Sequence, residues 1–335
     1  MGLDTSHPEV EFAVRAVRQA AQMAARIQSG MASANLTKSD LSPVTVADFG
    51  IQAVVARGLA AAFPGEPLVA EESSKDLRGA EGSAVLERAT EFVAGVFPDV
   101  TPDEVCAWID QGTGEPTDRF WVLDPIDGTK GYLRGGQYAV ALALVVDGHV
   151  RLGALGCPSL AAGCAPEAPG SGVLVVAVRG QGAWQTALND APAFDPMHVS
   201  TCAEAAQARV LRSFEAKHTN TAQFDELVQA MGIRADSVLM DSQAKYAVLA
   251  AGEGELLLRL LSADEPDYCE KIWDQAAGSI VIEEAGGRIT DLVGKPLDFT
   301  AGRRLLRNRG VLASNGALHG PALDAVAQVI GELRD

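Results

Sequence analysis

Apolar positions near the start of the chain recur at helical spacing. They follow one face of a helix from Phe12 to Ile27, after a segment, Ser6–Glu9, that has the form of a capping box. A second helix is predicted for residues 50–63, with Thr45–Asp48 as its cap. This pattern places Asp48 at a helix start.

Apolar runs at strand spacing come next, and acidic side chains stand at their ends. Residues 68–73 follow a Pro-Gly turn and predict a strand that ends near Glu71. A second apolar strand begins at Phe120 and leads directly into Asp124 and Asp127, which are three residues apart. One aspartate would be enough for a turn, so the second carboxylate indicates a further role.

The rest of the chain continues to alternate, without an internal repeat. Strands are predicted in a hairpin at residues 138–158 around the turn Asp147-Gly148, and at residues 173–180, 208–213, 237–240, 255–261, 288–290 and 311–314. Helices are predicted at residues 86–96, 221–232, 242–252, 273–287 and 316–333. A more antiparallel first half and an alternating second half predict a mixed α+β and α/β fold. We expect two parts, residues 1–175 and 176–335, with the boundary between residues 160 and 200.

Composition and charge limit the classes of function. The chain is 47% hydrophobic and 21% charged, which is typical of a soluble globular protein with a large core. With 44 acidic and 27 basic side chains, its net charge of −17 disfavours a nucleic-acid polymer or an anionic membrane as partner. A small anion that binds together with a metal ion is compatible with this charge. We therefore expect a small-molecule substrate and a monomer.

The cysteines and the N-terminus predict a cytoplasmic protein. Five scattered cysteines without a C-x-x-C pair indicate neither a disulfide framework nor a thiolate zinc site. The chain has no apolar run of about 18 residues, the length that would span a bilayer. Its first residues, MGLDTSHPEVEF, are too acidic for a signal or transit peptide.

Five carboxylates stand at the ends of predicted elements, where side chains that carry chemistry are usually mounted. They are Asp48, Glu71, Asp124, Asp127 and Asp274. Oxygen ligands without nearby histidine or cysteine favour hard cations, above all Mg²⁺, whose coordination substrate phosphate and water commonly complete. Two or three such ions would neutralise a phosphate and lower the pKa of the attacking water. Taken singly, each carboxylate could instead cap a turn or a helix, or lie on a solvated surface.

Two residues after Asp127 extend this candidate site. The hydroxyl of Thr129 beside a carboxylate can position a nucleophilic water, although it could also bond only within its own turn. Gly128 allows the backbone to approach a phosphate. The run Gly-Thr-Lys-Gly is not a P-loop, because it lacks the four-residue spacing and the Lys-Ser/Thr ending.

Three separated motifs carry a family resemblance. LDPIDGTKGYLRGGQYAVALALVVDG (residues 123–148), AEES (70–73) and WDQAAG (273–278) resemble the lithium-sensitive, magnesium-dependent phosphatases of the inositol monophosphatase superfamily. SPVTVAD, LMDSQAKYAVLA, ELLLRL and EKIWDQAAG resemble its 3′(2′),5′-bisphosphate nucleotidase branch. The resemblance covers nearly the whole chain and is weakest at residues 75–115 and 160–210.

The resemblance implies a fold and a metal site. The fold would be a layered α-β-α-β-α sandwich of the inositol monophosphatase and sugar phosphatase type. Its magnesium ligands would be Glu71, Asp124, Asp127, Asp274 and the carbonyl of Ile126. Two or three Mg²⁺ ions would bind, and Li⁺ would inhibit by replacing one of them. Asp48 paired with Thr129 would orient or deprotonate the attacking water.

The resemblance also implies a substrate. Enzymes of this branch remove the 3′-phosphate of adenosine 3′,5′-bisphosphate to give AMP, and 3′-phosphoadenosine 5′-phosphosulfate would be a related substrate. The residues that match its nucleotide site are Gly128, Thr129, Glu215, His218, Asp241, Ser242, Lys245 and Arg259, the last two meeting the 5′-phosphate. RSFEAKHTN follows the family pattern only loosely, and Gly136 stands where the branch has an acidic residue.

Other interpretations stay open at this point. An inositol mono- or polyphosphate 1-phosphatase would keep the carboxylates but have no use for Ser242, Lys245 and Arg259. A catalytically silent nucleotide-binding regulator would be expected to lack metal ligands, and none is missing here. His218, Lys245 and Arg259 could each be an ordinary surface residue instead of a substrate contact.

Overall fold

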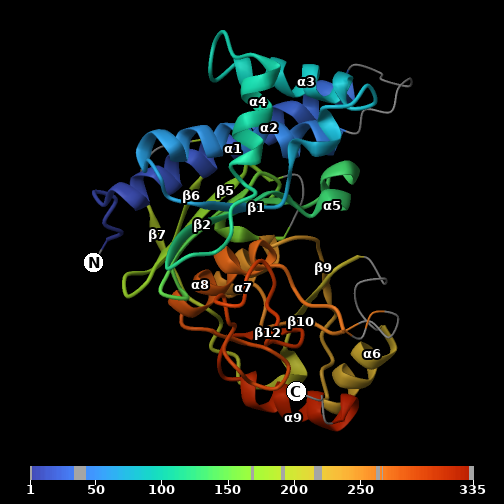
Figure 1. Ribbon diagram of the computed structural model, residues 1–335. Coiled ribbons are helices and arrows are strands. Elements are labelled where there is room, and N and C mark those ends of the chain that lie inside the picture. Colours follow the sequence, from blue (N-terminus) through green and yellow to red (C-terminus); the bar gives the residue numbers. More distant parts are fainter. Residues whose placement is uncertain are drawn as a thin grey trace.

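The computed structural model describes residues 2–33, 43–166, 170–189, 193–214, 221–261, 265 and 267–331. Helices and sheets are stacked in five layers, in the order helices, sheet, helices, sheet, helices (Figure 1). Three clusters of buried apolar residues fill the spaces between these layers. The layered α-β-α-β-α prediction is confirmed.

A seven-stranded sheet forms the second layer, and its strands lie side by side in chain order. They are β1 (Leu68–Ala70), β2 (Arg119–Asp127), β3 (Ala139–Val146), β4 (His149–Cys157), β5 (Val173–Val178), β6 (Gly182–Ala187) and β7 (Asp195–Met197). β1 pairs with β2 in parallel, and the pairs from β2 to β7 are antiparallel. The predicted hairpin is β3–β4, and Asp147 and Gly148 in its turn have positive φ angles of 51° and 74°. β6 and β7 were not predicted.

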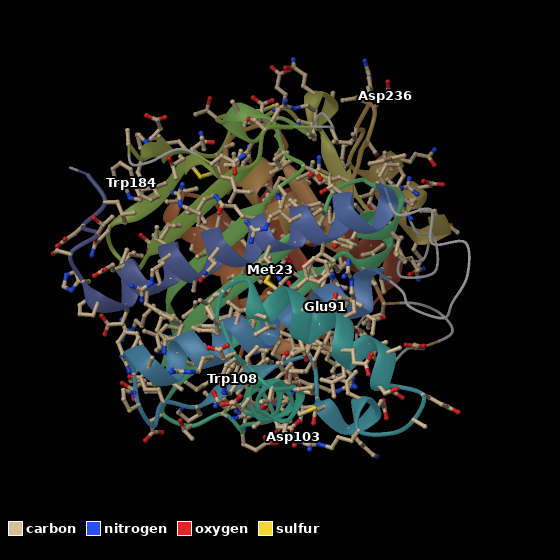
Figure 2. All side chains as sticks on the ribbon, turned by 90° about the horizontal axis from the view of Figure 1, so that it is seen from above. Met23, Glu91, Asp103, Trp108, Trp184 and Asp236 are labelled. Carbon is tan, nitrogen blue, oxygen red and sulfur yellow. The ribbon has the colours of Figure 1, made fainter. Side chains whose placement is uncertain are left out.

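Two long helices cover the outer face of this sheet, and two shorter ones pack against the second of them. They are α1 (Pro8–Ser33), α2 (Pro43–Ala62), α3 (Ser83–Ala94) and α4 (Pro102–Asp110). Seen from above, α1, which carries Met23, lies beside α2, and both α3, which carries Glu91, and α4, which carries Trp108, contact α2 (Figure 2). The sheet, α1, α3 and α4 enclose α2. Every residue of α2 from Val46 to Ala56 is therefore buried.

The start of α1 differs from the predicted one. Ser6 Oγ donates a hydrogen bond to Asp4 Oδ1 at 2.6 Å, and the carboxylate of Glu9 pairs with Arg119 at 3.0 Å. The predicted capping box is therefore wrong, because a contact with β2 draws the glutamate away from the helix start. The helix begins at Pro8.

The second helix also begins earlier than predicted, and a further helix was missed. α2 starts at Pro43, so Asp48 lies in its second turn and not at its cap. In α4, Thr101 Oγ1 accepts a hydrogen bond from the Glu104 backbone at 3.3 Å, and the Glu104 carboxylate accepts one from the Thr101 backbone at 2.9 Å. This capping box in Thr-Pro-Asp-Glu is a signal that the sequence does contain.

The middle layer consists of α7 (Ala244–Ala250) and α8 (Ala276–Glu284). Every residue of α7 is buried, as are the first seven of α8, because sheets cover both sides of the layer (Figure 1). Small residues allow the two helices to approach closely. A Cβ atom added to Gly278 in α8 would lie 2.1 Å from the ring of Tyr246 in α7.

A five-stranded sheet forms the fourth layer, in the order β11-β12-β10-β8-β9. Its strands are β8 (Val210–Arg212), β9 (Val238–Leu239), β10 (Leu256–Arg259), β11 (Arg288–Thr290) and β12 (Val311–Ser314). β8 is parallel to β9 and β10, whereas β12 is antiparallel to β10 and β11. The outer helices are α6 (Thr221–Ala230) and α9 (His319–Ile330). These elements fit the alternating second half that the sequence predicts.

Short elements lie in the connections between these layers. They are η1 (Ser74–Leu77), α5 (Thr129–Arg134), η2 (Ala162–Cys164), η3 (Ala205–Gln207) and η5 (Ile272–Asp274). The chain passes from the first sheet to the second between Met197 and Val210, whereas a division after residue 175 would fall within β5. The division into two parts stays a proposal. Within the described ranges, no helix is both long enough and apolar enough to cross a membrane.

The close contact between α7 and α8 predicts the effect of a single methyl group. Gly278→Ala should lower the free energy of unfolding by about 1–3 kcal/mol, the usual cost of extra volume in a packed core. The measurement is urea denaturation. Gly320→Ala in α9 is the matched control, because a Cβ atom there meets no atom within 4 Å. Equal losses of stability in the two variants would contradict the tight packing of the middle layer.

Candidate metal centre

The two aspartates of β2 come together because the strand contains an irregularity. Asp124 pairs with Ala141 and Asp127 with Ala139, so three steps along β2 match two along β3. In a regular strand, side chains three residues apart point to opposite faces of the sheet. The extra residue of a bulge corrects this. Oxygens of Asp124, Asp127 and Asp274 all lie within 4.8 Å of one another.

Asp274 reaches this position through a buried glutamine that links three segments. Gln243 donates from Nε2 to the carbonyl of Trp273 at 2.9 Å, and its Oε1 accepts from the backbone of Gly278 at 3.0 Å. Its own backbone N–H donates to Asp127 Oδ2 at 2.5 Å. Gln243 thereby holds η5, the start of α8 and the end of β2 in register.

Glu71 and Asp48 border this trio of carboxylates. Glu71 directly follows β1, a third of its side chain is exposed, and its Oε1 lies 3.8 Å from Lys271 Nζ. Asp48 is buried in α2. The negative charges of both residues raise the pKa of Asp124, so both lie within electrostatic reach of it. Three of the five predicted carboxylates therefore lie together, and the other two are close enough to act on Asp124 electrostatically.

Burial raises the pKa of these carboxyl groups. The pKa values of Asp48 and Asp124 lie well above the usual range, first because of burial and then because of neighbouring negative charges. The pKa of Asp274 rises to about 8 for the same first reason, although the charge of Arg259 opposes the rise. Asp48 Oδ1 and Asp124 Oδ1 are buried without a hydrogen-bond partner among the described residues. A hard divalent cation fits this set of oxygen donors and would supply what these atoms lack.

β2 passes into α5 through a residue that must be glycine. Gly128 has a φ of 88°, and a Cβ atom there would lie 2.7 Å from the Cβ atom of Ser242. Thr129 follows as the first residue of α5 and is exposed. The side chain of Ile126 is packed in the core with residues of α1 and α2. Since this side chain has no ligand atom, only the backbone carbonyl of Ile126 could serve as a ligand.

Besides Lys271, two more cationic side chains lie near the carboxylates. Lys245 is buried in α7, and its Nζ donates to Ser213 Oγ at 3.3 Å. Burial lowers the pKa of Lys245 to about 8, although the charge of Asp127 opposes this effect. Arg259 ends β10, and its Nη2 lies 3.9 Å from Asp274 Oδ2. An acidic centre next to two cations can bind a metal ion and an anionic group side by side.

The other predicted pocket residues divide into described and undescribed ones. Asp241 pairs with Arg134 at the end of α5. Ser242 has a φ of 70°, an uncommon value for a residue other than glycine that is often found at functional sites. Glu215 and His218 lie outside the described residues, so their predicted roles stay predictions.

Three polar residues that hold the site were not identified from the sequence: Gln243, Gln52 and Lys271. Gln52 is fully buried in α2, donates to the carbonyl of Glu72 at 2.7 Å and accepts from its backbone N–H at 3.0 Å. These two bonds fix the segment that carries Glu71. A glutamine inside the apolar run of a buried helix is the signal that could have revealed Gln52.

Sequence comparisons connect this chain to known enzymes along almost its entire length. A model of the inositol monophosphatase family matches residues 6–331. A 3′(2′),5′-bisphosphate nucleotidase from Schizosaccharomyces pombe is 39% identical over 341 residues, which cover 96% of this chain and 95% of that protein. A 3′(2′),5′-bisphosphate nucleotidase 1 from Arabidopsis thaliana is 40% identical over 344 residues, which cover 97% of each chain.

Solved structures of the same architecture are more distant in sequence. An inositol monophosphatase (IMPase) from Thermotoga maritima superimposes with a TM-score of 0.64 at 21% identity, covering 96% of this chain and 98% of that one. CysQ from Bacteroides thetaiotaomicron, described as a bacterial member of the inositol monophosphatase family, gives 0.61 at 18% identity and covers 93% and 97%. At these identities the likeness shows the fold alone.

The buried charges predict how stability depends on pH without metal. The pKa of Asp124 in the folded protein is raised above its ordinary value of 3.8. Its contribution to stability is therefore complete below about pH 4 and is lost as the pH rises toward the folded-state pKa.

Asp124→Asn should therefore stabilise the metal-free protein at about pH 8 and change its stability little near pH 4. The measurement is the free energy of unfolding of both proteins in chelator across this range. Added Mg²⁺ should then stabilise the wild type more than the variant. A difference between the two proteins that stays constant with pH would contradict a buried, ionisable Asp124.

Proposed function

The chain belongs to the inositol monophosphatase family, and we propose that it is a magnesium-dependent 3′(2′),5′-bisphosphate nucleotidase. It would hydrolyse the 3′-phosphate of adenosine 3′,5′-bisphosphate to give AMP and phosphate, and accept 3′-phosphoadenosine 5′-phosphosulfate as well. Relatives of that description from fungi and plants, 36–40% identical over at least 94% of this chain, support the proposal. The observation that carries it is the carboxylate trio next to Lys245 and Arg259.

The residues present fit a magnesium site. Glu71, Asp124, Asp127, Asp274 and the carbonyl of Ile126 would hold two or three ions, as in the family resemblance. The fit rests on an all-oxygen donor set and on the unpartnered, buried Oδ1 of Asp124. When bound, such ions neutralise phosphate charge and lower the pKa of a bound water.

Three residues of the chain would prepare the phosphate and the water for reaction. Asp48 Oδ1 is buried without a described partner, so it can accept a hydrogen bond from the attacking water and fix its direction. The exposed hydroxyl of Thr129 at the start of α5 can make a second bond to that water. Gly128 has no side chain and leaves room for the phosphate.

The cations beside the centre favour a substrate with a second phosphate group. Lys245 and Arg259 supply positive charge next to the carboxylates, at the place where the 5′-phosphate would lie. Binding a second anion would also repay the cost of burying Lys245, whose pKa falls to about 8 without one. An inositol monophosphate would leave both cations unused, which is why we rank that substrate second.

The class of partner, the cellular location and the oligomeric state are inferred from charge and composition. A formal charge of −17 favours a small phosphorylated nucleotide over a nucleic-acid polymer or an anionic membrane as the partner. Cytoplasmic location and a monomeric state stay predictions.

Phosphate release from a panel of substrates tests the proposed function. With Mg²⁺, the wild type should hydrolyse adenosine 3′,5′-bisphosphate much faster than inositol 1-phosphate or inositol 1,4-bisphosphate. Asp124→Asn should retain the fold and release no phosphate, and chelator should stop the wild type. If the protein prefers an inositol phosphate, it is an inositol phosphate phosphatase and not a nucleotidase. Nucleotide binding without any phosphate release would indicate a silent regulator.

Lithium provides a separate test of the metal chemistry. Millimolar Li⁺ should inhibit phosphate release, because it would replace one magnesium ion without supplying the same charge. Na⁺ at the same concentration is the control for ionic strength. Hydrolysis that is insensitive to Li⁺ would contradict the lithium-sensitive branch and leave the magnesium requirement to be tested by chelation.

A further inference from the structure

Arg259 and Glu270 form an ion pair with two hydrogen bonds at the edge of the carboxylate cluster. Nε of the arginine donates to Oε1 at 3.0 Å, and its Nη2 lies 2.8 Å from Oε2. Such bidentate geometry holds a guanidinium in one plane. Because Nη2 also lies 3.9 Å from Asp274, the pair fixes the guanidinium relative to the candidate metal centre.

The two partners of this pair differ in exposure. The side chain of Glu270 is 7% exposed, whereas that of Arg259 is 32% exposed. Within the described ranges, Nη1 of Arg259 forms no hydrogen bond or ion pair. The carboxylate is thus buried, whereas the arginine side chain is partly exposed and its Nη1 is not engaged by a described residue, so the guanidinium can bind an anion.

Glu270 is itself held by a chain of buried hydrogen bonds. Gln275 Nε2 donates to Glu270 Oε2 at 3.0 Å, and the hydroxyl of Tyr246 donates to Gln275 Oε1. All three side chains are buried. This network joins α7, the start of α8 and β10, and a fully bonded buried network of this kind is rigid.

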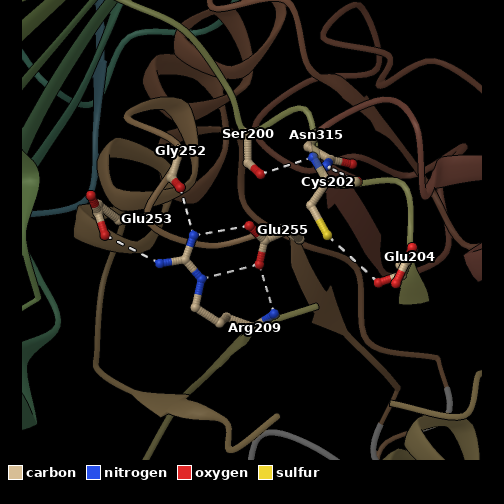
Figure 3. A network of polar contacts seen from close by, with 8 residues as sticks. All are labelled: Ser200, Cys202, Glu204, Arg209, Gly252, Glu253, Glu255 and Asn315. Carbon is tan, nitrogen blue, oxygen red and sulfur yellow. Dashed lines mark hydrogen bonds and ion pairs between the residues drawn. The ribbon is translucent and has the colours of Figure 1, made fainter. Parts of the chain in front are cut away.

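A second arginine paired with a buried glutamate in the same protein shows how a purely structural arginine is bound. Arg209 donates from Nε and Nη2 to Glu255, from Nη1 to Glu253, and from Nη2 to the carbonyl of Gly252 (Figure 3). Protein acceptors thus occupy all three of its nitrogens. Arg259 differs, because its pair with Glu270 occupies only two of its nitrogens.

We propose that Glu270, held by Gln275, is a positioning residue that orients Arg259 toward the second phosphate group of the substrate. It thereby sets the preference for a bisphosphate over a monophosphate. This inference rests on the proposed function, in which Arg259 and Lys245 bind the 5′-phosphate. The ion pair with Glu270 reduces the net positive charge that the phosphate would meet. It also orders the guanidinium before the substrate arrives, so less side-chain freedom is lost on binding.

The test compares kcat/KM for adenosine 3′,5′-bisphosphate with kcat/KM for adenosine 3′-monophosphate, which lacks the second phosphate. Glu270→Gln keeps the size of the side chain and removes its charge. It should lower the ratio of the two values about tenfold, mainly by raising KM for the bisphosphate. Glu270→Asp, which keeps the charge but withdraws the carboxylate by one methylene, should lower the ratio in the same direction.

A double variant tests whether Glu270 acts through the arginine. Glu270→Gln combined with Arg259→Lys should lower the ratio no further than Arg259→Lys alone, because effects that pass through one contact are not additive. Glu255→Gln is the matched control, since it removes the charge of the buried glutamate that pairs with Arg209. It should lower stability and leave the ratio unchanged.

Two results would overturn the inference while the proposed function stands. One is a Glu270→Gln variant that loses activity equally on both substrates, and the other is an additive double variant. A wild-type enzyme that hydrolyses neither nucleotide, or that has no preference for the bisphosphate, would instead contradict the proposed function and the inference with it.

Discussion

Two buried carboxylates, Asp48 and Asp124, lie close to other acidic side chains, and the surrounding elements have to offset the electrostatic cost of this arrangement. Asp124 is nearly inaccessible, its pKa is raised by burial, and the next causes are the negative charges of its neighbours. An ionised group in such a place costs several kcal/mol unless a counter-charge is close. Lys271 and Arg259 each offset one carboxylate of the cluster, at 3.8 and 3.9 Å. A bound metal cation would neutralise the remaining negative charge, which is why we interpret this arrangement as a metal site.

The layered fold supplies the rigidity that such a cluster requires. Its carboxylates come from α2, the end of β1, the bulge of β2 and η5, which are far apart in sequence. Apolar cores on both faces of the first sheet fix these elements, and Gln52 and Gln243 hold the segments that carry Glu71 and Asp274. The hydrophobic burial of the layers thus offsets the unfavourable electrostatics of the centre.

Much of this architecture could be predicted from the sequence, because β2, β3 and β5 of the first sheet are apolar on both faces and Asp147-Gly148 specifies the hairpin turn, whereas the more polar β6 and β7 were missed. The carboxylates could be collected because the sequence places them at the ends of predicted elements, which holds for Glu71 and Asp127 but not for Asp48, in the second turn of α2. The bulge in β2 could not be predicted, since it exists only in the pairing with β3. The capping box at Ser6–Glu9 was wrong because Arg119, distant in sequence, pairs with the glutamate. The roles of Gln243 and Glu270 are set by tertiary contacts that no local pattern contains.

Anomalous diffraction from crystals grown with Mn²⁺ would show whether this cluster is a metal centre. Mn²⁺ accepts the oxygen ligands that Mg²⁺ prefers, and it gives an anomalous signal. We expect peaks enclosed by Asp124, Asp127 and Asp274, with one within reach of Glu71. No peak at the cluster, or peaks only at acidic side chains on the surface, would contradict the metal centre.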